Sequence, residues 1–363
     1  MFTKKYKLTL TQDYVASWGM SQAVREIIQN SLDSESPFKY EFIYDELTET
    51  YTMRLDSDFS SLPIKTLLLG STSKAENKNA IGSFGEGYKI ALLVLTRLGH
   101  PVTITNGKKV WTPAFEFCRE FEEDLLVITE ENNPTKYFGL RFEVGMLSAE
   151  DVEQIKSSCL LMRKAVGEAI STYKGDILLD LPGVLYVGNL FICNTNLTYG
   201  YNIKPEFITL ERDRQTVSSW DLEWVVKDMW LATERYDFIA GLMEKDTADI
   251  RAIKFDCPEL LREACYRLFK TKYKGSVAAR SQEELDGLVA KGMTSVVVVS
   301  SSSFYTGVSS SNSYLSEVTP TILKLPLEVL EEFFQENKGC MRKKALVNFK
   351  TLLEKAEDWR NKY

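Results

Sequence analysis

One stretch near the start of the chain, Ser21 to Ser34 (SQAVREIIQNSLDS), constrains the fold most strongly. At about 100° per residue, a helix places Glu26, Asn30 and Asp33 in one narrow polar stripe. The apolar residues of the stretch fall on the opposite side, and they are Val24, Ile27, Ile28 and Leu32. The pattern therefore predicts an amphipathic helix with one side packed against the rest of the protein.

The polar stripe has two interpretations. A carboxylate, a carboxamide and a second carboxylate at positions i, i+4 and i+7 can supply a base for water, an oxygen ligand for Mg²⁺ and a further acceptor. The same stripe is also typical of the solvated side of a surface helix. The helix by itself does not decide between a chemical site and an exposed face.

A glycine-rich stretch further along the chain bears on that choice. Residues 80–95 read AIGSFGEGYKIALLVL, so that Gly82, Gly85 and Gly87 precede an apolar run of good helix formers. Glycines permit positive φ and close backbone approach, and a loop that opens a helix directs free N–H groups at an anion. The stretch predicts a phosphate-binding loop, although it lacks the G-K-[S/T] of a P-loop and the preceding strand of a Rossmann fingerprint.

In order and separation, the two stretches resemble the N-box and the second glycine box of the GHKL ATPases. That superfamily holds gyrase B, the ninety-kilodalton heat-shock chaperones, the sensor histidine kinases and MutL. The matching residues are Glu26-x-x-x-Asn30-x-x-Asp33 and Gly82-x-Phe84-Gly85-x-Gly87. The resemblance implies that residues 1–175 form an α+β domain of the Bergerat type, a two-layer α/β sandwich with a mixed, mainly antiparallel sheet.

The resemblance also implies ATP and Mg²⁺ as ligands, with slow ATP hydrolysis that drives lid closure and a domain or dimer rearrangement. In this pattern Asn30 holds Mg²⁺ and Glu26 activates the attacking water. The other residues carried over as nucleotide contacts are Asp33, Asp56, Ser73, Lys74, Gly82, Phe84, Gly85, Gly87 and Lys89. For Ser73 and Lys74 the alternative is an ordinary solvated loop, and for Lys89 it is an exposed helix cation. The expected partners are the nucleotide, a second copy in a homodimer and another protein.

Two departures from the family pattern fall on the adenine side. The family's D-x-G-x-G motif corresponds to Asp56-Ser57-Asp58-Phe59-Ser60, in which Asp56 fits the aspartate that reads adenine and Asp58 is the alternative after a slip of two residues. A later glycine-threonine pair of the family corresponds to Gly139 and Leu140, so the threonine hydroxyl is missing. A different nucleotide, or a catalytically degenerate scaffold that acts as a protein-binding or inhibitory module, is therefore the alternative reading.

Composition sets the wider limits. The chain has 363 residues, of which 44% are hydrophobic and 26% charged, which is ordinary for a soluble protein of two or three domains. It has no apolar run near the roughly 20 residues that span a bilayer and no signal-peptide core, so we expect a cytoplasmic protein without a membrane segment. The net charge of −7 argues against broad nucleic-acid binding. Six scattered cysteines and one histidine disfavour zinc sites and Cys/His nucleophilic pairs.

The second half, residues 176–363, predicts a further α/β domain that is transducer-like or partner-binding-like. A division of this domain near residue 250 is the alternative. A helix is expected over 148–171, and a strand–helix–strand unit over 275–300. The serine-rich residues 300–313 predict a flexible loop, and two closing helices follow at 326–337 and 342–355.

Overall fold

A computed structural model of the chain describes residues 3–34, 36–68, 87–134, 137, 139–210, 217–322 and 326–360. These residues fall into two units, Met1–Glu234 and Arg235–Tyr363. Both units combine helices and strands, which confirms the predicted α+β class. No described helix has both the length and the apolar composition needed to cross a membrane.

The first unit is built on a seven-stranded sheet in which all neighbouring strands run antiparallel. In spatial order the strands are β1 (Lys4–Thr11), β6 (Glu123–Asn132), β5 (Lys109–Cys118), β4 (Val102–Asn106), β7 (Leu140–Leu147), β3 (Thr50–Ser57) and β2 (Lys39–Asp45). The expected sheet was mixed and mainly antiparallel, and the described sheet is antiparallel throughout. Hairpins account for three of its six pairings, β2 with β3, β4 with β5 and β5 with β6, because hairpin neighbours run antiparallel.

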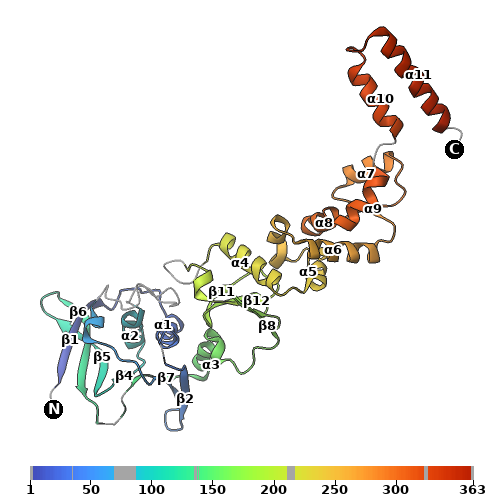
Figure 1. Cartoon of the computed structure of the whole chain (residues 1–363). Coiled ribbons are helices and arrows are strands. Elements are labelled where there is room, and N and C mark those ends of the chain that lie inside the picture. The colour runs from blue at the N-terminus through green and yellow to red at the C-terminus, as the bar shows by residue number, and fades with distance from the viewer. Residues whose placement is uncertain are drawn as a thin grey trace. The chain divides into compact units, whose positions relative to one another are not determined.

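Three helices pack against this sheet and close its core. They are α1 (Met20–Leu32), α2 (Gly87–Arg97) and α3 (Ala149–Ser158), and α1 packs against both others, with α1 and α2 side by side (Figure 1). The fully buried core side chains include Ala23, Val24, Ile27, Ile28, Met53, Ala91, Leu92, Val94, Ile104 and Val144. The apolar side predicted for the first helix is therefore its packed side, as expected.

A second, five-stranded sheet belongs to the same unit. Its strands in spatial order are β11 (Leu190–Asn194), β10 (Val184–Val187), β12 (Gly200–Ile203), β9 (Gly175–Leu178) and β8 (Ala169–Thr172). Helix α4 (Ser219–Ala232) packs on it, and Trp230 Nε1 donates to the hydroxyl of Tyr201 at 2.9 Å. The predicted domain boundary after residue 175 falls within β9, so this sheet begins before that boundary.

The helix predicted over 148–171 is too long. Its start is confirmed, because Ser148 caps α3 and exchanges hydrogen bonds with Asp151. The helix ends at Ser158, where Cys159 forms a bridge to Leu190 and the chain turns toward the second sheet. A tertiary strand pairing therefore ends a segment whose local sequence still favours a helix.

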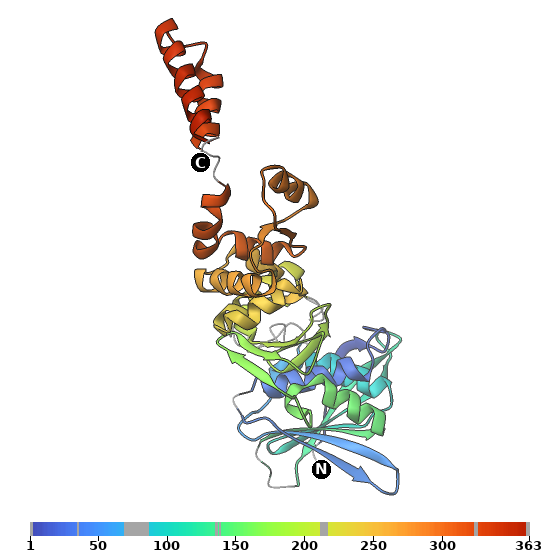
Figure 2. The ribbon, with the colours of Figure 1, turned by 90° about the vertical axis from the view of Figure 1, so that its right-hand side faces the viewer.

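The second unit is mainly helical. Its described α-helices and strands are α5 (Tyr236–Glu244), α6 (Glu259–Lys272), β13 (Val277–Ala279), α7 (Gln282–Ala290), β14 (Val296–Val298), α8 (Ser302–Ser309), α9 (Asn312–Ile322), α10 (Pro326–Asn337) and α11 (Lys343–Arg360), and a 3-10 helix, Ala248–Phe255, lies between α5 and α6. Strands β13 and β14 pair in parallel with α7 between them, which confirms the predicted strand–helix–strand unit. Figure 2 shows the ribbon after a quarter turn, with the two closing helices in red.

The flexible loop predicted over 300–313 is wrong. Helix α8 occupies most of this stretch, and α9 begins at its end. Ser301 Oγ accepts the N–H of Phe304 at 3.3 Å, and Ser311 Oγ accepts the N–H of Tyr314 at 3.0 Å. The serines thus serve as caps at the helix starts rather than as a flexible tether.

Candidate functional site

Helix α1 is the element that positions the predicted catalytic residues. It begins after Gly19, whose N–H is accepted by the side chain of Gln22 at 3.1 Å. It ends at Leu32, and the C-cap residue Asp33 donates its N–H to the carbonyl of Gln29 at 2.9 Å. Asp33 is thus the residue that closes the helix, and its half-buried side chain lies at the end of the predicted polar stripe.

The polar stripe of α1 is not a solvated face. Glu26 is only 4% exposed, and its polar neighbours Arg25 and Gln29 are buried as well, while Asn30 is half-buried. Burying a carboxylate is costly unless other groups compensate it. The surface-helix interpretation of this stripe is therefore wrong at Glu26, because both sides of α1 are covered at that turn.

Asn30 is oriented by its own helix. Its Nδ2 donates to the backbone oxygen of Glu26 at 2.9 Å. This bond fixes the amide plane, and it turns Oδ1, the atom that can only accept, away from that carbonyl. The Glu26 carboxylate and the Asn30 amide oxygen are thus hard oxygen donors on consecutive turns of one helix.

The glycine-rich motif lies mostly outside the described residues. Ser73, Lys74, Gly82, Phe84 and Gly85 all fall within 69–86, which the structure does not describe. Gly87, the last glycine of the motif, is the first residue of α2. The helix that the motif was predicted to open is therefore present beside α1, while the predicted phosphate contacts before it stay predictions.

Lys89 and Tyr88, in the first turn of α2, anchor this helix. Lys89 is fully buried, and its ammonium donates to the carbonyl of Leu68. The hydroxyls of Tyr88 and Thr66 lie 2.9 Å apart. The two described segments that flank residues 69–86 are thus tied together. The alternative of Lys89 as an exposed helix cation is wrong, and its contact with a phosphate stays a prediction.

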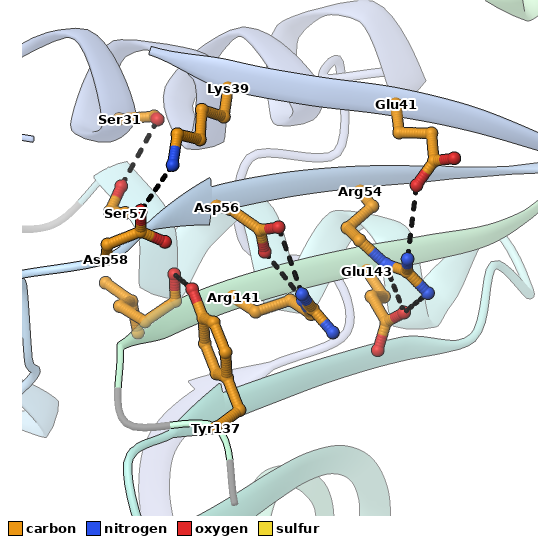
Figure 3. Close-up of polar contacts among 11 residues, drawn as sticks. Ser31, Lys39, Glu41, Arg54, Asp56, Ser57, Asp58, Tyr137, Arg141 and Glu143 are labelled. Atoms are coloured by element: carbon orange, nitrogen blue, oxygen red, sulfur yellow. Dashed lines mark hydrogen bonds and ion pairs between the residues drawn. The ribbon is translucent and has the colours of Figure 1, made fainter. Parts of the chain in front are cut away.

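Asp56 lies on the other face of the sheet. Along β3, Met53, Leu55 and Ser57 are buried toward the helices, whereas Asp56 is only part-buried and belongs to the alternate face. Its carboxylate accepts two hydrogen bonds from the opposite residue Arg141, Nε to Oδ1 at 2.6 Å and Nη2 to Oδ2 at 3.0 Å (Figure 3). The structure therefore does not bring Asp56 together with Glu26 and Asn30.

The outer face around Asp56 carries a lattice of alternating charges. We call this set the outer charge lattice, and its members are Lys39, Glu41, Arg54, Asp56, Asp58, Arg141 and Glu143 (Figure 3). Bonding to Asp56 raises the pKa of the Arg141 guanidinium, and the ring of Tyr137 lies 4.4 Å from that guanidinium. Asp58, the alternative adenine reader, pairs with Lys39 in the same lattice. Both candidate carboxylates are thus engaged within the protein.

Ser57 and Ser31 are polar residues of the helix-covered face that sequence reasoning missed. Their hydroxyl oxygens lie 3.4 Å apart, and both side chains are buried between α1 and the end of β3 (Figure 3). The available signal was the apolar alternation of Met53 and Leu55, which predicts that Ser57 rather than Asp56 shares their face.

Gly139 and Leu140 lie next to Ser57, at the end of β3. A Cβ on Gly139 would lie 2.8 Å from the Cα of Asp58 and 2.9 Å from the carbonyl oxygen of Ser57. Only glycine therefore permits this approach of the two strand ends. Leu140 pairs with Ser57 and is buried in the core on the helix side. Where the family pattern expects its adenine contacts, the side chains that face the helices are therefore the hydroxyl of Ser57 and the apolar side chain of Leu140.

Among the described residues, no group of three or more His, Cys, Asp and Glu side chains could hold a metal ion. The metal ligand predicted here is the Asn30 amide, with the remaining positions left to phosphate and water. That prediction does not require an acidic cluster, since Mg²⁺ keeps several waters and is often bound together with substrate phosphates.

Comparison with known proteins leaves the family open. No family model matches the chain. The chain is similar to an uncharacterized protein of Mycoplasma pneumoniae (strain ATCC 29342 / M129 / Subtype 1), with 26% identity over 222 residues that cover 56% of this chain and 87% of the relative. Since the relative's name states no activity, the GHKL resemblance stays a prediction that these findings neither support nor exclude.

Proposed function

We propose that the sheet carrying α1 and α2 binds a magnesium–nucleotide complex of the ATP type and hydrolyses it slowly. The observation that carries the proposal is the burial of Glu26 on the polar side of α1, one turn from the oriented amide of Asn30. An ordinary amphipathic helix leaves such a carboxylate in water. Buried carboxylates are usually paired with another group or coordinate a metal ion.

The donor atoms on α1 suit the phosphate and metal side of such a ligand. A bound magnesium ion would screen the phosphate charges and polarise the terminal phosphoryl group. Asn30 would hold the ion through Oδ1, because its nitrogen is already committed to the helix backbone. Glu26 would accept a proton from water at a carboxylate oxygen. The proposed coupling of turnover to domain or dimer rearrangement rests on the GHKL resemblance alone.

The base side fits adenine less well. Asp56, the expected adenine reader, bonds Arg141 on the outer face, and the polar side chain that β3 turns toward α1 is Ser57. A hydroxyl can donate or accept, so it discriminates poorly between purines whose edges differ in donor and acceptor pattern. We therefore expect ATP and GTP to bind with affinities within about tenfold, which corresponds to about 1.4 kcal/mol.

The test is calorimetric titration of Mg-ATP and Mg-GTP, paired with measurement of phosphate release. Glu26→Gln keeps the shape of the side chain, so it should retain binding while turnover falls by about 10²–10⁴-fold. Asn30→Ala should weaken magnesium-dependent binding. Glu41→Gln is the matched control, because it makes the same change at an exposed carboxylate of the outer face and should alter neither quantity.

A second candidate function is a degenerate scaffold that binds another protein without turnover. The observation that favours it is the engagement of both adenine-side carboxylates, Asp56 with Arg141 and Asp58 with Lys39. Absence of binding heat and of phosphate release with every purine nucleotide, in a folded sample, would reject the first proposal and leave this one.

A further inference from the structure

Strand β2 forms one edge of the seven-stranded sheet. Its seven residues, Lys39 to Asp45, pair with β3 in an unbroken register that runs from Lys39↔Asp56 to Asp45↔Thr50. An edge strand presents a row of N–H and C=O groups that can pair with another chain, and proteins usually blunt such edges with charged side chains, proline, bulges or very short strands. Strand β2 carries three charges, Lys39, Glu41 and Asp45, so any partner strand has to match them. The β2 sequence KYEFIYD has no proline, and its pairing shows no bulge.

An aromatic row follows β2 on the helix-covered face. Tyr40, Phe42 and Tyr44 alternate along the strand, opposite Leu55, Met53 and Tyr51 of β3. The rings of Tyr40 and Phe42 lie 6.1 Å apart in an edge-to-face arrangement. Phe42 packs against the core, but Tyr40 and Tyr44 remain 39% and 50% exposed. Two of the three rings thus keep apolar surface available beside the open edge.

We propose that this edge binds a second copy of the same chain, with the two β2 strands antiparallel and centred on Phe42. This register places Lys39 opposite Asp45 of the second copy, and Tyr40 opposite its Tyr44. Phe42 meets its counterpart, and the two-fold symmetry makes every unlike pair occur twice. The two sheets become one continuous sheet, and the aromatic row continues across the junction.

The charges of β2 select this register over its neighbours. A two-fold axis between antiparallel strands requires that opposite side chains share a face, so the centre moves in whole residues. A centre at Glu41 places two glutamates opposite each other. A centre at Ile43 places Glu41 opposite Asp45. Like charges directly opposite are destabilising, whereas the centre at Phe42 pairs a lysine with an aspartate and Glu41 with Ile43.

The intramolecular contacts of these residues are compatible with the pairing. Lys39 bonds Asp58, and the carboxylate of Asp45 accepts the N–H of Leu47 at 2.9 Å. That backbone bond holds the pKa of Asp45 below its ordinary value, so the carboxylate is charged at neutral pH. Both side chains are exposed, and an ammonium or carboxylate can serve two partners at once.

The experiment is sedimentation equilibrium of the full chain across a concentration series. Asp45→Lys and Lys39→Glu each replace two attractive pairs by two repulsive ones, so each should weaken self-association by about tenfold or more. Glu131→Lys is the matched control, since it makes the same charge change at an exposed position of β6, well away from β2 in the strand order, and should leave self-association unchanged. Circular dichroism and urea unfolding verify that each variant is folded.

Mixing the two disruptive variants tests the register itself. In a mixed pair, one end of the junction keeps the native pairing of Lys39 with Asp45. At the other end, the lysine introduced at position 45 of one chain lies opposite the glutamate introduced at position 39 of the other, so this end is also an attractive pair. Association should therefore return to within about threefold of the wild type. A wild-type chain that stays monomeric up to the highest concentration overturns the proposal.

Self-association that neither variant weakens, or that mixing does not restore, overturns the proposal as well, because the copies then meet through another surface or register. The proposal does not depend on nucleotide binding.

Discussion

Carboxylates lie on both sides of the seven-stranded sheet, but their surroundings differ. On the helix-covered face Glu26 is buried one turn from the oriented amide of Asn30, and the buried β3 side chains on this face are Met53, Leu55 and Ser57, of which Ser57 alone is polar. On the outer face Asp56 meets Arg141 in a two-bonded ion pair within the outer charge lattice. The comparison teaches that a motif match alone does not assign a role to an acidic residue. The face of the sheet on which the residue lies decides which groups its carboxylate can reach.

The largest effect expected in this comparison comes from Gly139, where the ends of β7 and β3 meet. Gly139→Ala would place a Cβ 2.7 Å from the hydroxyl of Tyr137, 2.8 Å from the Cα of Asp58 and 2.9 Å from the carbonyl of Ser57. Two of these three atoms belong to the backbone and cannot move alone. We expect a loss of about 1–3 kcal/mol in the free energy of unfolding, measured by urea denaturation.

Gly145→Ala, toward the other end of β7, is the matched control. Its Cβ would meet a ring carbon of Pro101 at 3.0 Å and Thr52 Oγ1 at 3.5 Å, both side-chain atoms that can shift. We expect a smaller loss than at Gly139. Equal losses at both positions, or a larger loss at Gly145, would show that the close approach at Ser57 is not what requires a glycine.

The position of Asp56 illustrates what the sequence could and could not predict. Motif matching along the chain assigned Asp56 to the base side, while the alternation of Met53 and Leu55 in the same strand already indicated the opposite face. The two-residue alternation of side chains along a strand decides on which face Asp56 lies, because a shift of one residue moves a side chain to the other face of the sheet. The polar stripe of α1 was predictable from its spacing, but its burial was not, since a helical wheel does not say what covers each side.

Beyond the seven-stranded sheet, too, some elements could be predicted from local sequence, while others depend on tertiary contacts. The parallel pair β13 and β14 around α7 was predictable, because strand and helix periods alternate there. The run over 300–313 was not, since serine is as typical of helix caps as of linkers, and Ser301 and Ser311 act as caps. The end of α3 at Ser158 depends on the pairing of Cys159 with Leu190, which local sequence does not contain.

An intermediate effect is expected from the ion pair on the outer face. In a double-mutant cycle of Asp56→Asn and Arg141→Gln, we expect a coupling of about 1 kcal/mol at low salt that falls in 1 M salt, because the pair is only part-buried. The same cycle at the more exposed Lys39 and Asp58 should give a smaller coupling.

Titration of Mg-ATP into the Asp56→Asn variant extends that cycle to function. If the nucleotide lies on the helix-covered face, the affinity should stay within about threefold of the wild type, which is less than about 1 kcal/mol. Loss of binding in a folded Asp56→Asn protein would instead support the family assignment of this aspartate as the base reader, and it would remove the distinction between the two faces.

The smallest effect concerns one tyrosine on each face. Burial raises the pKa of Tyr88, beside α1, to about 12. Burial and then the charge of Asp56 raise the pKa of Tyr137, on the outer face, to about 12. Both values exceed the roughly 10 of an unfolded chain, so the fold favours the neutral phenol. This contribution to stability is complete below pH about 10, and it is lost as the pH rises from about 10 to 12.

The Asp56→Asn variant should change the pKa of one of these two tyrosines and leave the other unchanged. Removing the carboxylate takes away a negative charge beside Tyr137 and leaves Arg141 facing it, so the pKa of Tyr137 should fall while that of Tyr88 stays unchanged. The measurement is an NMR titration of protein labelled at the tyrosine Cζ, with the two resonances assigned through Tyr88→Phe and Tyr137→Phe. An unchanged pKa at Tyr137 would mean that the Asp56 carboxylate does not set it. A shift in the pKa of Tyr88 would mean that the sheet does not insulate one face from charges on the other. Because Asp56 and Arg141 lie on the face away from α1, such coupling would also reopen Asp56 as a contributor to the site at Glu26.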